Sequence, residues 1–93
     1  SGRIHIDSGA KDAVLNHKSL LPVGIVRVEG DFGKGDVADI VSDGAVIAKG
    51  IVSYSSKELA SIAGRKSHEI EKLLGYRGHS DAVISENLVL LVS

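Results

Sequence analysis

A glycine-rich stretch, residues 19–36 (SLLPVGIVRVEGDFGKGD), constrains the fold of this chain more than any other segment. It holds the one proline of the chain, Pro22, which fixes its own φ and cannot donate a backbone hydrogen bond. A β-branched run, Ile25 to Val28, comes next, and three glycines follow it within six residues. The glycines are Gly30, Gly33 and Gly35. This order predicts a strand, a turning loop and a new strand that begins near Asp36.

The three glycines allow two interpretations. A phosphate-cradling loop works because backbone N–H groups converge at the start of a helix. Here a strand is predicted after the glycines, so we interpret the loop as a corner in which glycine supplies positive φ. Asp7 and Asp36 lie close to glycines at strand ends, and we expect both to accept hydrogen bonds from loop amides rather than to act in acid–base catalysis.

The start of the chain is predicted to form a short strand followed by a short helix. Residues 3–7 alternate polar and apolar side chains, which is typical of a half-buried strand. Apolar residues at i, i+3 and i+4 predict a short helix over residues 10–16, with Asp7 or Ser8 as its N-cap.

Two long apolar runs, residues 37–41 and 46–54, are joined by Ser42-Asp43-Gly44-Ala45. An Asp-Gly pair between apolar runs is a strong hairpin signal, because glycine accepts the positive φ of tight hairpin turns. Gly50 lies inside the second run and predicts a bulge or a close backbone approach.

The second half begins with Ser55-Ser56-Lys57-Glu58, which has the S-x-x-E form of a capping box and predicts a helix ending near residues 63–64. A second short helix is predicted over residues 67–75. Residues 81–84 and 88–92 are strand-like, and the last run is apolar enough that we expect it to be buried and to close the sheet.

The composition limits the classes of protein to which the chain can belong. The 93 residues favour one domain, and with three aromatic residues the core is expected to consist of Val, Ile and Leu. The absence of cysteine excludes disulfides and thiolate metal sites. A net charge of −1 argues against strong non-specific nucleic-acid binding. No run approaches the roughly 18 apolar residues of a membrane span and no signal peptide is recognisable, so a cytoplasmic location is expected.

Candidate catalytic and metal-binding residues are sparse. The histidines show no metal-ligand spacing, and a surface role is expected for each. They are His5, His17, His68 and His79. No Ser–His–Asp arrangement is evident, since the serines lie mostly at predicted caps and turns.

Several segments of the first half resemble the PUA domain, which is named for pseudouridine synthases and archaeosine transglycosylases. The segments are 6–10 (IDSGA), 18–25 (KSLLPVGI), 30–36 (GDFGKGD) and 47–51 (IAKGI).

The second half is similar to the PUA domain at the end of bacterial glutamate 5-kinases. The segments that carry this similarity are 54–56 (YSS), 63–70 (AGRKSHEI), 74–76 (LGY) and 87–90 (NLVL). Two positions depart from the family pattern. His17 stands where the family usually has a glycine, and residues 84–86 (ISE) stand where it tends to have His-Arg-Asp.

The resemblance implies a mixed α/β, mainly β, pseudo-barrel of about six strands with short helices. It implies that residues 1–93 are a single PUA domain and a fragment of a longer kinase. That parent enzyme transfers the γ-phosphate of ATP to the side chain of glutamate in proline biosynthesis, uses Mg²⁺ and is inhibited by proline. Its catalytic, ATP and Mg²⁺ sites lie in an amino-acid-kinase domain, so no catalytic residue or cofactor site is expected in this fragment.

Two functions follow from the resemblance. The first is an accessory and regulatory domain that contacts its own amino-acid-kinase domain within a homo-oligomer and has no membrane partner. The alternative is an RNA-binding module, because in RNA-binding PUA domains the first helix and its exit loop face the RNA. That alternative points to Lys11, His17 and Lys18, which otherwise form an ordinary solvated face.

Overall fold

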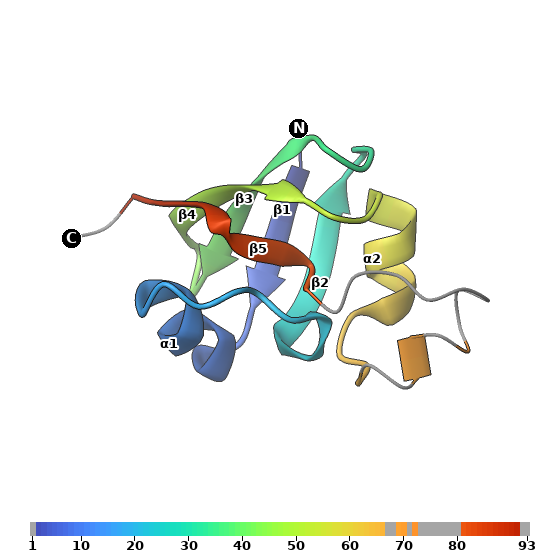
Figure 1. Cartoon of the computed structure of the whole chain (residues 1–93), viewed down its shortest axis with the longest axis horizontal. Helices are drawn as coiled ribbons and strands as arrows, with labels where there is room; N and C mark the ends of the chain where they lie inside the picture. Colours follow the sequence, from blue (N-terminus) through green and yellow to red (C-terminus); the bar gives the residue numbers. More distant parts are fainter. Residues whose placement is uncertain (1, 67–68, 71, 73–80, 92–93) are drawn as a thin grey trace.

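The computed structural model describes residues 2–66, 69–70, 72 and 81–91 of the chain. These residues form a mainly β domain in which one sheet is accompanied by two short α-helices and a 3₁₀ turn (Figure 1). The strands are β1 Gly2–Ile6, β2 Ile25–Gly30, β3 Val37–Ser42, β4 Ala45–Val52 and β5 Val83–Leu90. The helices are α1 Ser8–Leu15, η1 Pro22–Gly24 and α2 Ser56–Ile62.

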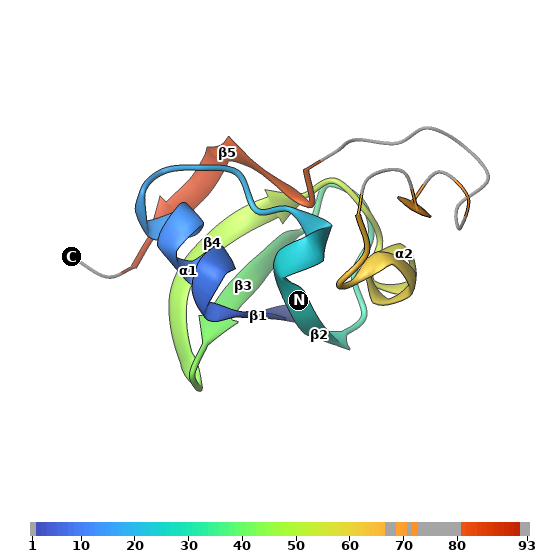
Figure 2. The same cartoon turned by 90° about the horizontal axis from the view of Figure 1, so that it is seen from below.

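The sheet has the strand order β2-β1-β3-β4-β5, with β1 parallel to β3 and every other neighbouring pair antiparallel. It curls, so that β5 crosses in front of the first strands in Figure 1, whereas the view from below in Figure 2 shows β5 set apart from β1 and β2. An isolated bridge between Leu20 and Val83 adds a contact on the far side of β5. The predicted fold class is therefore confirmed. About six strands were expected, and the described residues form these five and the Leu20–Val83 bridge.

The core fills the inside of the curled sheet. Its members are mostly Val, Ile and Leu, as the composition predicted. The expectation that large rings would be absent from the core is wrong, because Phe32 is 5% and Tyr54 is 2% exposed. Phe32 lies just after the end of β2 and Tyr54 just after the end of β4, and an aromatic ring buries a large apolar area at such a position.

Helix α1 begins at Ser8, before the predicted range of residues 10–16, and Asp7, one of the two predicted capping residues, is its N-cap. The Asp7 Oδ1 atom accepts a hydrogen bond of 2.8 Å from the Ala10 N–H, which satisfies one of the free donors of the first turn. The Asp7 N–H donates to the Gly24 carbonyl at 3.0 Å. This residue therefore ties the start of α1 to η1, where Pro22 occupies the first helical position.

The glycine loop is a corner, as expected, but only part of it needs glycine. Gly30 and Gly35 have φ of 86° and 92°. Gly33 is not among the positive-φ residues, and its N–H donates to Asp36 Oδ2 at 2.8 Å. The prediction that Asp36 accepts a hydrogen bond from a loop amide is therefore confirmed.

The β3–β4 hairpin turns at Asp43 and Gly44, whose φ values are 51° and 78°. Two positive φ values are typical of the tight turn that the Asp-Gly pair predicted. Past Gly50 the register of β4 against β5 shifts between Gly50 and Val52, so the predicted irregularity is also present.

Helix α2 has the complete capping box. The Glu58 N–H donates to Ser55 Oγ, and the Ser55 N–H donates to Glu58 Oε1, both at 3.2 Å. The helix ends at Ile62, and Gly64 follows with φ of 77°. The second predicted helix, residues 67–75, lies mostly outside the described residues.

The last strand differs from its prediction in two ways. Residues 83–90 form one continuous strand instead of two strand-like pieces. It was expected to be buried, yet Val89 is 62% and Leu91 is 49% exposed. The reason is that β5 pairs with β4 at the end of the sheet order, so alternate side chains point away from the core. None of the helices in the described part of the chain is long and apolar enough to span a membrane.

Candidate functional site

The three predicted RNA-binding residues lie on α1 and on its exit. Lys11 is half-buried on α1, whereas His17 and Lys18 are exposed in the turn that follows. The backbone of this turn is held by hydrogen bonds from the His17 N–H to the Val14 carbonyl at 3.1 Å and from the Lys18 N–H to the Ala13 carbonyl at 2.9 Å. The structure thus places all three on one continuous segment, and no side-chain bond joins them within the described residues.

His17 has φ of 61°, a left-handed conformation that few residues other than glycine adopt readily. The resemblance to the family leads us to expect a glycine here, and a left-handed φ is the conformation that glycine adopts most readily.

A groove of about 280 Å³ separates α1 from η1, and we refer to it as the α1 groove. Its floor is formed where Gly24 lies against Ala10, and Leu21 and Val23, 46% and 47% exposed, line one wall. The full lining is Asp7, Gly9, Ala10, Ala13, Ser19, Leu21, Val23 and Gly24. An apolar groove beside exposed cations can hold a flat apolar group while the cations contact phosphate.

A second charged region was missed by the sequence analysis. Glu29 Oε1 lies 2.6 Å from His5 Nε2 and 2.6 Å from Arg27 Nη2, and the two nitrogen atoms are 3.3 Å apart. The hydrogen bond from His5 lowers the pKa of Glu29 from its ordinary value, and the charges of Arg27, His5 and Arg3 act in the same direction against desolvation. The predicted surface role of His5 is therefore too simple, because its side chain is 22% exposed and bonded to a carboxylate.

The same outer face of the sheet carries four charged residues in one row across four strands. Arg3 is opposite both Glu29 and Asp39, and Asp39 is opposite Lys49. We call these four residues the charged row. Lys49 Nζ lies 3.8 Å from Asp39 Oδ1.

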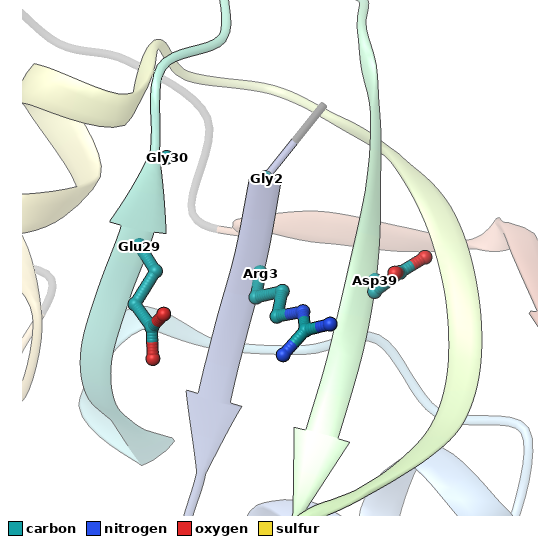
Figure 3. Close-up of a pocket in the computed structure, with 5 residues that line it drawn as sticks. All are labelled: Gly2, Arg3, Glu29, Gly30 and Asp39. Carbon is teal, nitrogen blue, oxygen red and sulfur yellow. The ribbon is translucent and has the colours of Figure 1, made fainter.

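Figure 3 shows Arg3 on β1 with Glu29 of β2 on one side and Asp39 of β3 on the other. With Gly2 and Gly30 they line a hollow of about 270 Å³. The guanidinium group of Arg3 forms no hydrogen bond or ion pair with any other described residue. The period-2 placement of these charges is visible in the sequence, but their meeting across strands depends on the register.

Catalytic or metal-binding groups do not gather in either region. Within the described ranges, no three His, Asp or Glu side chains lie close enough together to hold a metal ion. Asp7 and Asp36, considered as acid–base candidates, accept backbone hydrogen bonds instead.

The comparison with known proteins agrees with this fold. Residues 2–74 match the PUA domain family, and the chain belongs to that family. Its similar relatives include glutamate 5-kinases, of which those from Methanosarcina acetivorans and Thermoanaerobacter pseudethanolicus are 46% and 47% identical over 91 and 93 residues. Each alignment covers 98% of this chain, but the chain spans only about a quarter of the length of these relatives, 24% and 25%.

Solved structures show the same fold. A PUA domain from Aeropyrum pernix K1, determined as a tartrate complex, has a TM-score of 0.63 and 25% identity, over 89% of this chain and 41% of that one. The archaeal box H/ACA sRNP Nop10–Cbf5 complex contains a chain with a TM-score of 0.63 and 20% identity, over 96% of this chain and 23% of that one.

Proposed function

We propose that this chain is the non-catalytic PUA domain of a glutamate 5-kinase, with an accessory and regulatory role. The parent enzyme phosphorylates glutamate with ATP and Mg²⁺ in proline biosynthesis, in the cytoplasm. The observation that carries the proposal is the identity of 46–47% over nearly the whole chain with enzymes of which it spans about a quarter. In this proposal the partner of the domain is the amino-acid-kinase domain of its own polypeptide.

A domain exchange tests this function. The matching PUA region of the Methanosarcina mazei glutamate 5-kinase, which is 46% identical to this chain, is replaced by these 93 residues. We expect the hybrid to phosphorylate glutamate and to respond to proline as the intact enzyme does, whereas an enzyme without the region should have altered regulation. The purified 93-residue chain should form no glutamyl phosphate from ATP.

Two controls make the exchange decisive. The first control is a hybrid that carries the Aeropyrum pernix PUA domain, which has the same fold as this chain but only 25% of its residues in common. If the hybrid with this chain behaves like the truncated enzyme, or no better than the Aeropyrum hybrid, the accessory role is refuted. Glutamyl phosphate formation by the isolated chain would refute the non-catalytic assignment.

RNA binding is the second candidate, and the α1 groove is the observation that favours it. The groove is lined mainly by apolar atoms of α1 and η1, and Lys11, His17 and Lys18 lie on α1 and its exit. None of the three side chains is bonded to another described residue, so their donors are available to phosphate. A base would lie in the groove and the backbone would contact the lysines.

A titration of fluorescent RNA at two salt concentrations tests this second function. Contacts to two lysines release few counterions, so log K should fall against log salt with a slope of about −2 on duplex RNA, and less steeply on single strands. The double change Lys11→Ala and Lys18→Ala should weaken binding equally for all RNA sequences, because phosphate contacts carry no base information.

The matched control changes Lys34→Ala and Lys57→Ala, which removes the same charge from exposed positions outside this segment. Equal losses in both double variants would mean a non-specific charge effect and would refute the site at α1. Absence of binding by the wild type would leave the accessory role as the function of the domain.

A further inference from the structure

The charged row alternates in sign across the sheet. In the strand order β2-β1-β3-β4 its members are Glu29, Arg3, Asp39 and Lys49, or negative, positive, negative, positive. Their side chains share the outer face, since Arg3, Glu29 and Lys49 are exposed and Asp39 is half-buried. A nucleic acid, which is uniformly negative, would meet two carboxylates on this face, so the pattern fits a surface of mixed sign.

An alternating row of this kind is complementary to itself. A twofold axis parallel to the strands and lying between β1 and β3 reverses the order of the strands in the second copy. Arg3 then faces Asp39 of the second copy, and Glu29 faces Lys49. Because the contact is isologous, each of these pairs occurs twice.

The apolar residues and the hollow of this face obey the same symmetry. Val37 and Ile51 are opposite one another on β3 and β4, and they are 52% and 41% exposed. Four of the five residues that line the hollow belong to the other half, to β1 and β2, and the fifth is Asp39 of β3 (Figure 3). Gly2 pairs with Ala38, the residue after Val37, so the hollow and the apolar pair are at the same end of the strands. The axis that matches the charges therefore also brings the apolar pair of each copy to the hollow of the other.

Arg3 is the side chain best suited to anchor such a contact. It has five N–H donors, and it makes no hydrogen bond or ion pair within the described part of the chain. Its two neighbouring carboxylates already have partners, Glu29 with His5 and Arg27, and Asp39 with Lys49. Arginine is also enriched among the residues that dominate protein interfaces.

We propose that the outer face of β2-β1-β3-β4 binds the same face of a second copy of this chain, about a twofold axis parallel to the strands. This inference goes beyond the proposed function and does not depend on it, because it uses only the surface of these 93 residues.

Sedimentation equilibrium of the 93-residue chain tests the proposal. The wild type should form dimers whose dissociation constant rises with salt, since the contacts are exposed charges. Arg3→Glu places a carboxylate against Asp39 of the second copy, and Asp39→Arg places a guanidinium against Arg3. Each variant alone should dimerise at least about tenfold more weakly than the wild type.

The decisive sample is an equimolar mixture of the Arg3→Glu and Asp39→Arg variants. In a heterodimer, the carboxylate introduced by the first change would face the guanidinium introduced by the second. The unchanged Asp39 of one chain and the unchanged Arg3 of the other would also face each other, so dimers should return to near the wild-type level. Repulsion within each chain is the same in the mixture as in the separate samples, so a purely intramolecular role of the row would show no such recovery.

Lys57→Glu, an equal change of charge at an exposed position of α2, is the control and should leave dimerisation unchanged. Far-UV circular dichroism verifies that every variant is folded. A wild type that stays monomeric at millimolar concentration, dimers of Arg3→Glu as tight as the wild type, or a mixture that fails to recover dimers would each overturn the proposal.

Discussion

At the scale of single residues, Gly24 is the position at which η1 packs against α1. A Cβ at this position would lie 2.5 Å from the Cβ of Ala10 on α1. The φ of Gly24 is not positive, so the need for glycine here is closeness of packing and not backbone conformation. The same contact forms the floor of the α1 groove.

Gly24→Ala should lower the free energy of unfolding by about 1–3 kcal/mol, because it forces an extra methyl group into a filled space. Urea denaturation measures the loss. Adding Ala10→Gly removes the opposing methyl and should recover part of the stability, although a glycine in α1 itself costs about 0.5–1 kcal/mol. If the two changes were simply additive, the contact between them would not be the cause.

Glu29 gives a second test at this scale, through pH. Its pKa is lowered from 4.5 in the folded chain, chiefly by the hydrogen bond from His5. A depressed carboxyl pKa contributes stability that is present above the unfolded pKa and is lost as the pH falls through the folded pKa. The contribution therefore begins to be lost as the pH falls below about 4.5, and it is gone once the pH is below the lowered pKa of the folded chain.

We expect Glu29→Gln to be less stable than the wild type near neutral pH and to approach it as the pH falls through that range. Thermal melts between neutral and strongly acidic pH measure the two curves. Asp12→Asn, at an exposed position of α1, is the matched control. Parallel curves for Glu29→Gln and the wild type would contradict the account of the His5 hydrogen bond.

At the scale of the elements, local signals decide where each element begins and ends. The Asp7 cap, the capping box of Ser55 and Glu58, and the turn at Asp43 and Gly44 are all made by residues within three positions of one another. The hairpin turn is the simplest of these signals to test by mutation, because nothing lies within 4 Å of a Cβ at Gly44.

Gly44→Val should lower the free energy of unfolding by about 1 kcal/mol or more, because a β-branched residue resists the positive φ of this turn. With no steric contact to relieve, the loss would report backbone strain alone. Gly44→Asn should lose less, since asparagine tolerates the left-handed region. An unchanged denaturation midpoint for the valine variant would contradict the turn geometry.

At the scale of the whole molecule, Phe32 connects parts of the chain that are far apart in sequence. Its N–H donates to Ser56 Oγ at 3.2 Å, and its carbonyl accepts from the Ser56 N–H at 2.9 Å. Its ring packs directly against Gly2 at the start of β1. One residue of the glycine loop thus joins the first strand to α2 and closes one end of the curled sheet.

Phe32→Ala should cost about 3–5 kcal/mol, a large part of the roughly 5–15 kcal/mol that stabilise a domain of this kind. We expect the variant to be partly unfolded at 37 °C, as measured by circular dichroism and urea denaturation. Phe32→Leu fills more of the space and should lose less. A small loss in the alanine variant would mean that the ring does not close the core.

Much of the fold could be predicted from the sequence, because its signals are local. The hairpin, both caps, the bulge near Gly50 and the end of α2 before Gly64 each depend on residues that are neighbours in the chain. The fold class was predicted from the short segments that resemble PUA domains, which are also local features of the sequence. Lys11, His17 and Lys18 were selected from their position on a predicted helix, and their role in binding RNA remains a prediction.

What the sequence by itself determined, then, is where the elements lie and where they turn, since a capping side chain or a positive φ acts over a few residues. The tertiary structure alone decided which strands are neighbours and in what register. It brought Arg3 between Glu29 and Asp39, bonded His5 to Glu29, left Val89 exposed at the end of the sheet and buried the ring of Phe32. The physical reason is that strands distant in sequence become neighbours only in the folded chain, and the register of their pairing decides which face each side chain takes.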